Sequence, residues 1–175
     1  PPWTVDPVVI TAVGRLGRAD VVPTLRQLLA SPEPSAAEGA PDAVPAGVRH
    51  REAAVALARL GDPAGLRWIR ARLTGADGSP PTTRVDAARA AARLRDPESV
   101  APMVQLLVAP LAEPAPDGSL PPGASGLTAD GASTVLGALA GYGTPANWRL
   151  VARVVGRAPH LAAPFLELAD SVAWS

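Results

Sequence analysis

The side chains that carry most protein chemistry are sparse in this chain and lie far apart. The 175 residues contain two histidines, His50 and His160, and no cysteine. A metal site needs several ligands at short spacing, and a nucleophile needs a neighbouring base; neither pattern occurs. Signatures of serine hydrolases, zinc proteases, phosphate-binding loops and dinucleotide-binding turns do not occur either. The sequence therefore predicts no catalytic residue, no metal and no cofactor, and we expect a protein that is not an enzyme.

The remaining candidates for binding are arginines around one tryptophan. Trp68 lies between Arg67 and Arg70 in the segment 57–73 (LARLGDPAGLRWIRARL), where one helical pattern stops at Gly-Asp-Pro and another starts. Arginine and tryptophan are enriched where proteins bind partners. The alternative is that a neighbouring side chain covers Trp68, because tryptophan is usually largely buried. The choice depends on the elements that position these residues.

The Gly-Asp-Pro joint belongs to a pattern that occurs four times. Its pentads are VGRLG at 13–17, LARLG at 57–61, AARLR at 91–95 and LAGYG at 139–143. Asp-Pro or Thr-Pro follows the last three. Such pairs start helices, because the side-chain oxygen caps free N–H groups and proline fits the first helical position. The predicted caps are Asp62, Asp96 and Thr144, with Asp20 in the first unit, and Gly61 and Gly143 favour a left-handed helix end.

Each unit is therefore predicted to be a helical hairpin, helix A followed by helix B. The units cover about 6–30, 48–74, 83–108 and 131–156, and one more helix is predicted at 160–174. Hydrophobic residues make up 47% of the chain but aromatic residues only 3%, which favours close helix packing. The helix B residues expected to face inward are Val22, Leu25 and Leu29; Leu66, Ile69 and Leu73; Val100, Met103 and Leu107; and Trp148, Val151 and Val155.

Two segments resemble a known repeat family. The patterns VRxxAAxALxxLGDP ending at Pro63 and VxAAxAAxxLxDP ending at Pro97 resemble HEAT repeats of the bilin-lyase (PBS-lyase) subtype. The resemblance extends over four units and most of the chain. It implies an all-α, armadillo-type fold: one domain over 1–175 that forms a right-handed α–α superhelix, or α-solenoid, with A helices on the convex side and B helices on the concave side. It does not imply one activity.

The surplus residues between units form three predicted loops, at 31–47, 75–82 and 109–130. They are rich in proline, glycine and acidic residues and contain no arginine, although the net charge of the whole chain is zero. The basic residues, all of them arginine, therefore lie in the helical units. Two interpretations stay open: solvated arginines beside flexible acidic linkers, or a basic surface with an acidic fringe that takes an acidic partner.

The candidate partner-binding residues follow from the helical register. The side of each helix B opposite its inward residues forms one row across the array, the floor of the concave groove. The residues of this surface that we expect to contact a partner are Gln27, Arg67, Trp68, Arg70, Gln105, Arg149 and Arg153. Arg15, Arg59 and Arg93 share another repeat position, near the end of helix A, where positive charge is mildly favourable.

The leading functional prediction is a non-catalytic scaffold or adaptor that binds a protein or peptide, an acidic one included. One alternative is nucleic-acid binding, as in HEAT-like DNA glycosylases, but zero net charge and the lack of a basic residue between Arg95 and Arg149 argue against it. Another is a bilin-lyase-like or enzyme-assisting subunit, on fold analogy alone.

The cellular setting is predicted from what the chain contains. No apolar run reaches the roughly 18 residues of a membrane span, and no signal peptide is visible, so we expect a cytoplasmic protein without a membrane anchor. The chain starts at Pro1 rather than at methionine, so the sequence does not show where the native chain begins. The use of arginine alone, with abundant alanine and proline, indicates a GC-rich bacterial gene. The oligomeric state stays open.

Overall fold

The computed structural model describes residues 6–32, 46–109, 125–163, 165 and 166, and among them it contains helices and no strand. The all-α prediction is confirmed for this part of the chain. The helices come in the predicted pairs, A before B. The A helices are α1 Pro7–Arg15, α3 Ala46–Arg59, α5 Pro81–Leu94 and α7 Ala129–Ala140, and the B helices are α2 Val22–Ala30, α4 Pro63–Thr74, α6 Val100–Val108 and α8 Pro145–Arg157. Short 3-10 helices are η2 Ala19–Val21, η4 Pro97–Ser99 and η5 Pro159–Leu161.

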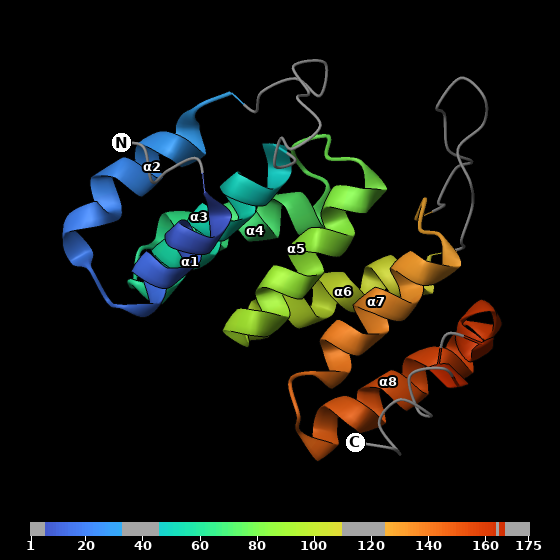
Figure 1. Ribbon diagram of the computed structural model, residues 1–175. Helices are drawn as coiled ribbons and strands as arrows, with labels where there is room; N and C mark the ends of the chain where they lie inside the picture. Colours follow the sequence, from blue (N-terminus) through green and yellow to red (C-terminus); the bar gives the residue numbers. More distant parts are fainter. Residues whose placement is uncertain (1–5, 33–45, 110–124, 164, 167–175) are drawn as a thin grey trace. The chain divides into compact units, whose positions relative to one another are not determined.

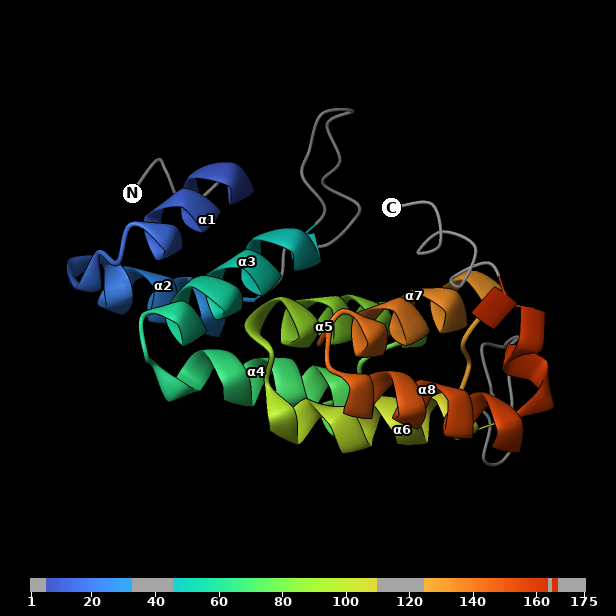
Figure 2. The ribbon, with the colours of Figure 1, turned by 90° about the horizontal axis from the view of Figure 1, so that it is seen from below.

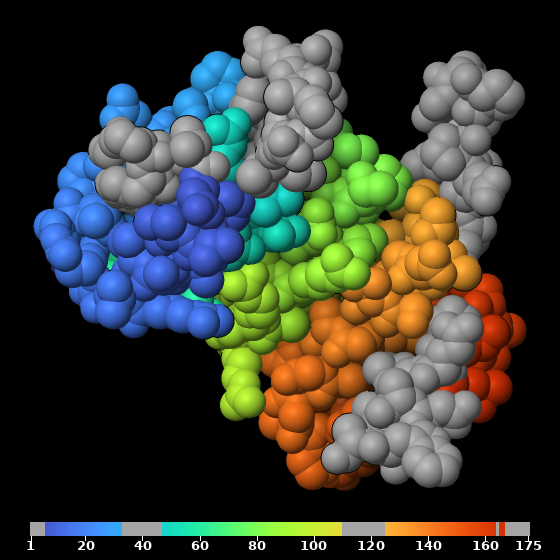
Figure 3. Space-filling model, viewed as in Figure 1, coloured from blue at the N-terminus to red at the C-terminus, as the bar shows by residue number. Residues whose placement is uncertain are grey.

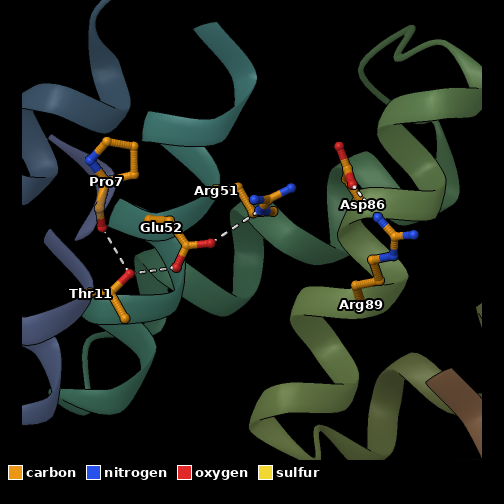
Figure 4. Close-up of polar contacts among 6 residues, drawn as sticks. All are labelled: Pro7, Thr11, Arg51, Glu52, Asp86 and Arg89. Atoms are coloured by element: carbon orange, nitrogen blue, oxygen red, sulfur yellow. Dashed lines mark hydrogen bonds and ion pairs between the residues drawn. The ribbon is translucent and has the colours of Figure 1, made fainter. Parts of the chain in front are cut away.

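The chain divides into two compact units, Pro1–Arg70 and Ala71–Ser175, and the boundary falls within α4. In the first unit α1 and α2 both pack against α3 (Figure 1). Its buried core consists of Ile10, Leu25, Ala53, Ala56 and Leu57. A polar contact crosses the same packing: Thr11 Oγ1 lies 2.8 Å from Glu52 Oε2 and 2.8 Å from the Pro7 carbonyl oxygen (Figure 4). Arg51 in turn donates to Glu52 at 3.2 Å, so the buried carboxylate is satisfied.

In the second unit the helices form two layers. Figure 2 shows α5 and α7 side by side in one layer and α6 and α8 in the other. The atoms of α5 and α7 lie against each other along most of their length (Figure 3). The fully buried side chains between the layers include Met103, Leu107, Leu136, Leu139 and Leu161. Each layer thus buries one stripe of each helix, as expected for amphipathic helical hairpins.

The four joints between helix A and helix B share one backbone feature. We define the joints as residues 17–21, 61–65, 95–99 and 143–147. The first residue of each joint has positive φ: Gly17 at 69°, Gly61 at 79°, Arg95 at 52° and Gly143 at 69°. The left-handed helix end predicted for Gly61 and Gly143 is confirmed, and Arg95 adopts it without the freedom of glycine. The repeat in the sequence is therefore a repeat in backbone conformation.

The predicted register of the B helices is confirmed at its central position. Leu25, Ile69, Met103 and Val151 are all 0% exposed. The position three residues earlier is half-buried in all four units, and there the expectation of a core Trp148 is wrong. That position lies at the edge of the buried stripe, where a large side chain keeps part of its surface in solvent.

Two of the predicted helix caps are confirmed and two are wrong. Asp62 Oδ1 accepts from the Ala64 backbone N–H at 2.9 Å, and Thr144 Oγ1 accepts from Asn147 at 3.2 Å. Asp20 instead binds the side chain of Arg18, and no side-chain cap begins α2. Asp96 occupies the cap position of η4 but accepts from the Ser99 hydroxyl at 2.5 Å, with no cap bond to backbone.

The loop and terminal predictions fall only partly on the described residues. Residues 33–45, 110–124 and 167–174 lie outside them. The ends of the predicted loops are corrected by a few residues: α3 already includes Gly47, α5 begins at Pro81, and α7 begins at Ala129. Proline fits the first turn of a helix, which explains the earlier start of α5. The single domain over 1–175 stays a prediction.

Candidate binding surface

The seven predicted contact residues lie on the B helices, and most of them are exposed. Gln27, Arg67, Gln105, Arg149 and Arg153 are exposed, whereas Trp68 and Arg70 are half-buried. The first four along the chain, up to Arg70, belong to the first unit, and the last three belong to the second. Each group is therefore considered within its own unit.

In the first unit the second joint, residues 61–65, contains an ion pair. Asp62 has a side chain only 3% exposed, and Arg26 of α2 donates to its Oδ2 at 2.6 Å. The Arg26 hydrogen bond, followed by the Ala64 N–H and the charges of Arg26 and Arg67, lowers the pKa of Asp62 below its ordinary value, against an opposing effect of desolvation. Arg67 thus has an electrostatic role at the joint, and its exposed position does not by itself mark a partner site.

In the second unit the B helices enclose a shallow apolar groove, which we call the α6–α8 groove. It has a volume of about 120 Å³. Its lining residues are Val104 and Val108 of α6 and Leu150, Arg153, Val154 and Arg157 of α8. Val108 is 43% exposed, although it is a large apolar residue. The groove therefore combines apolar walls with two guanidinium groups.

The arginines of α8 form a row along one exposed face. Arg149, Arg153 and Arg157 follow each other at intervals of four residues, which places them on the same side of a helix. The helix contains no acidic residue, and no ion pair links these arginines to the described part of the chain. Arg149 donates only to the Pro145 carbonyl, at 3.3 Å. This part of the surface is positive and uncompensated by the described residues.

A different arginine shows how charges are compensated elsewhere in the second unit. On α5, Arg89 lies 3.6 Å from Asp86 (Figure 4). Its other terminal nitrogen donates to Thr134 of α7 at 3.3 Å. Arg89 is therefore paired, whereas no described residue pairs the α8 row. Because charge without a local partner attracts groups of opposite sign, the α8 row is the stronger candidate for contact among the described residues.

The structure separates Gln105 from Arg153, which sequence reasoning placed in one row. Gln105 lines a pocket on the other flank of α6, together with Arg84. Sequence reasoning missed Arg157, although its spacing from Arg153 repeats the Arg149–Arg153 interval. It also missed Val104, Val108 and Arg84. These three carry no local signal, because a groove exists only once α6 has packed beside its neighbours.

The two histidines each contact a backbone carbonyl oxygen. His50 is 2% exposed, and its Nε2 lies 3.0 Å from the Ser31 carbonyl oxygen. His160 Nε2 lies 3.1 Å from the Leu107 carbonyl oxygen. Both contacts tie a histidine to the end of a B helix. The described residues contain no group of three or more histidine, aspartate or glutamate side chains placed to hold a metal ion.

Comparison with known proteins adds no family to this geometry. No protein-family model, curated protein or solved structure matches the chain. Within the described segments, no helix has the length and apolar character needed to cross a lipid bilayer. The function must therefore be argued from the surface itself.

Proposed function

We propose that the chain is a HEAT-like helical-repeat module that binds a protein or peptide through the outer faces of its B helices and catalyses no reaction. The observation that carries the proposal is the α6–α8 groove. Its apolar walls offer burial to a partner's side chains, and the adjacent arginines offer directional, charge-assisted hydrogen bonds. A mixture of exposed apolar residues and arginine is typical of binding surfaces rather than of a solvated helix face.

The four repeated hairpins support a binding surface that extends over several B helices. Four hairpins share a positive-φ joint and a fully buried central residue on helix B. Hairpins with equivalent buried stripes stack into a solenoid, and in a solenoid the B helices form a continuous concave face. The proposed architecture is the right-handed superhelix implied by the resemblance. The proposed partner is acidic, to match the α8 arginines, which no described residue pairs.

Site-specific photocrosslinking in the cell of origin tests this function. A photoreactive amino acid at Val108 or Leu150 labels whatever occupies the α6–α8 groove, and the same amino acid at Arg93 of α5 samples an exposed A-helix face of the same unit. We expect one discrete crosslinked product from the groove positions and none from position 93. Mass spectrometry then identifies the partner and the segment that is bound.

Charge reversal provides the matched control. Arg153→Glu with Arg157→Glu is expected to remove the groove crosslink, because it turns attraction for an acidic partner into repulsion. Arg89→Glu, on the exposed face of α5, changes charge by the same amount per residue and should leave the crosslink in place. The proposal is wrong if position 93 crosslinks the same partner as well as the groove positions do, or if the double reversal has no effect.

A further inference from the structure

The pocket on the other flank of α6 has the composition of a site for a small acid. Its volume is about 190 Å³, and it lies entirely within the second unit. It is lined by Leu73 and Thr74 at the end of α4, Arg84 of α5, Pro102, Gln105, Leu106 and Ala109 of α6 and its C-terminal end, and Ser125. Apolar walls thus enclose one cationic group and a few neutral polar groups.

Arg84 is the group that makes this pocket unusual. Its side chain is half-buried, its Nε is enclosed, and neither a hydrogen bond nor an ion pair joins the side chain to any described residue. Arg72 of α4, by contrast, binds Asp77 and donates to Ser79 Oγ at 3.1 Å. Removing a guanidinium from water without a counterion is costly, so a half-buried arginine is normally paired.

The Arg84 guanidinium lies close to the backbone of Gly75. A Cβ at residue 75 would lie 2.6 Å from Arg84 Cζ and 2.7 Å from its Nε, so a larger residue there would displace the end of the Arg84 side chain. Gly75 also has φ of 70°, which suits glycine. Glycine at this turn therefore leaves space for the guanidinium beside the pocket.

We infer that this pocket binds a carboxylate group carried on a short apolar chain. One guanidinium matches the single negative charge of a carboxylate and its planar geometry. A phosphate, with a charge of nearly two and three acceptor oxygens, would leave charge uncompensated here. Leu73, Pro102 and Leu106 supply the apolar contacts for the chain that carries the acid. The inference concerns the pocket alone and holds whether the acid is free or part of a peptide.

Nuclear magnetic resonance of the full chain with labelled arginine tests the inference directly. Hexanoate is the probe, 1-hexanol is its neutral counterpart, and inorganic phosphate is the competing anion. We expect hexanoate to shift the Arg84 Nε–Hε resonance in a saturable manner and to do so more strongly than either control. The inference is overturned if Arg84 does not respond at saturating hexanoate, if hexanol shifts it equally, or if phosphate binds more tightly.

Variants then assign the effect to Arg84. Arg84→Gln should weaken hexanoate binding about tenfold or more, as expected for the loss of a charge-assisted hydrogen bond. Arg95→Gln removes the same charge at an exposed site about three helical turns further along and should leave the affinity unchanged. Gln105→Glu is a second variant, on the exposed rim, and should weaken binding by repelling the ligand. Undiminished binding in both pocket variants contradicts the inference.

Peptides distinguish the source of the acid. A peptide with glutamate between leucines is compared with the same peptide carrying glutamine, both amidated at the C-terminus. Binding of the glutamate peptide alone identifies an acidic side chain of a protein partner. If hexanoate binds and neither peptide does, the pocket takes free carboxylic acids, and peptide binding at this pocket is contradicted while the carboxylate site itself stands.

Discussion

The second and third joints share an Asp-Pro pair but begin helix B in different ways. In the second joint Asp62 caps the backbone of Ala64, and α4 starts directly at the following proline. In the third joint the carboxylate of Asp96 accepts from the Ser99 hydroxyl instead, and a 3-10 turn precedes α6. The two other joints follow the same division. Thr144 caps and α8 starts at once, whereas Arg18 does not cap and the 3-10 helix η2 intervenes.

The division follows whether the side chain at the cap position accepts a hydrogen bond from the backbone. A side-chain oxygen that accepts from the first free N–H groups satisfies them and lets α-helical hydrogen bonding begin at the proline. Without that bond, the tighter i to i+3 pattern satisfies the first turn. In the third joint Ser99 competes with the backbone for the aspartate. Ser99 occupies the position of Gly65, which has no side chain that could compete in this way.

Replacing Gly65 by alanine is the largest expected disruption of the second joint. A Cβ at residue 65 would collide with the Ala54 carbonyl oxygen and lie 2.6 Å from the Ala58 nitrogen, and backbone atoms cannot move aside easily. We expect Gly65→Ala to lower the free energy of unfolding by about 3 kcal/mol. Urea denaturation followed by circular dichroism measures it.

Gly156→Ala is the matched control for that substitution. Gly156 lies in α8 with open space around its Cβ position, so alanine there should raise the free energy of unfolding by about 0.5–1 kcal/mol. If Gly65→Ala is as well tolerated as Gly156→Ala, the close approach of α4 to α3 does not occur in solution.

Removing the Asp62 carboxylate should make the start of α4 resemble that of α6, with a 3-10 turn before the α-helix. Asp62→Ala loses the cap and the Arg26 contact, and we expect a loss of about 1–2 kcal/mol. Asp62→Asn keeps an oxygen acceptor and should lose less. Chemical shifts of residues 63–66 report whether a 3-10 turn forms.

The same carboxylate predicts a pH dependence. Because its pKa is lowered in the folded state, its contribution is complete above the unfolded pKa of about 3.9 and is lost as the pH falls through the folded value. The stability difference between wild type and Asp62→Asn should therefore shrink with acid. A difference that stays constant between pH 6 and pH 2 contradicts the ionic role of Asp62.

Tyr142 stabilises the third joint from the next repeat. Its hydroxyl donates to the Asp96 carbonyl oxygen at 2.7 Å, and Tyr142→Phe should cost about 1 kcal/mol. Burial, followed by the nearby Asp96 charge, raises the pKa of Tyr142 to about 12. The protonated phenol is thus favoured in the fold, so its contribution is present below about pH 10 and is lost as the pH rises through the folded value. Ultraviolet titration of this single tyrosine measures the pKa, and a midpoint near 10 contradicts its burial.

The smallest expected effect is a gain at the start of the third joint. Arg95 has φ of 52° and is exposed, so Arg95→Gly should stabilise the protein by about 0.5–1 kcal/mol through relief of left-handed strain. Gly61→Ala at the equivalent place in the second joint should destabilise it by about 1 kcal/mol. Equal and opposite shifts in thermal midpoint would show that the two joints share one backbone requirement. A loss of stability in Arg95→Gly would show that the Arg95 side chain makes a favourable contact.

The sequence by itself determined the elements and their local geometry. The pentads placed the left-handed turns at Gly61 and Gly143, and apolar spacing placed Ile69 and Met103 in the core. These features depend on backbone preferences and on neighbours one helical turn apart, which the sequence contains directly. The candidate surface was predicted only in outline: Arg149 and Arg153 were identified, but Arg157 and the apolar walls were not.

Tertiary structure decided what depends on competition and on packing between helices. The sequence identified Asp96 as a cap, but the Ser99 hydroxyl, three residues further on, binds its carboxylate instead. The sequence assigned no role to Arg84, but in the fold Arg84 lies beside Gly75 and lines a pocket. The first outcome depends on which of several competing donors lies within hydrogen-bonding distance of the carboxylate. The second depends on surfaces that form only when segments distant in the chain pack together. Local patterns encode neither quantity, which is why the helices could be predicted and the binding pocket could not.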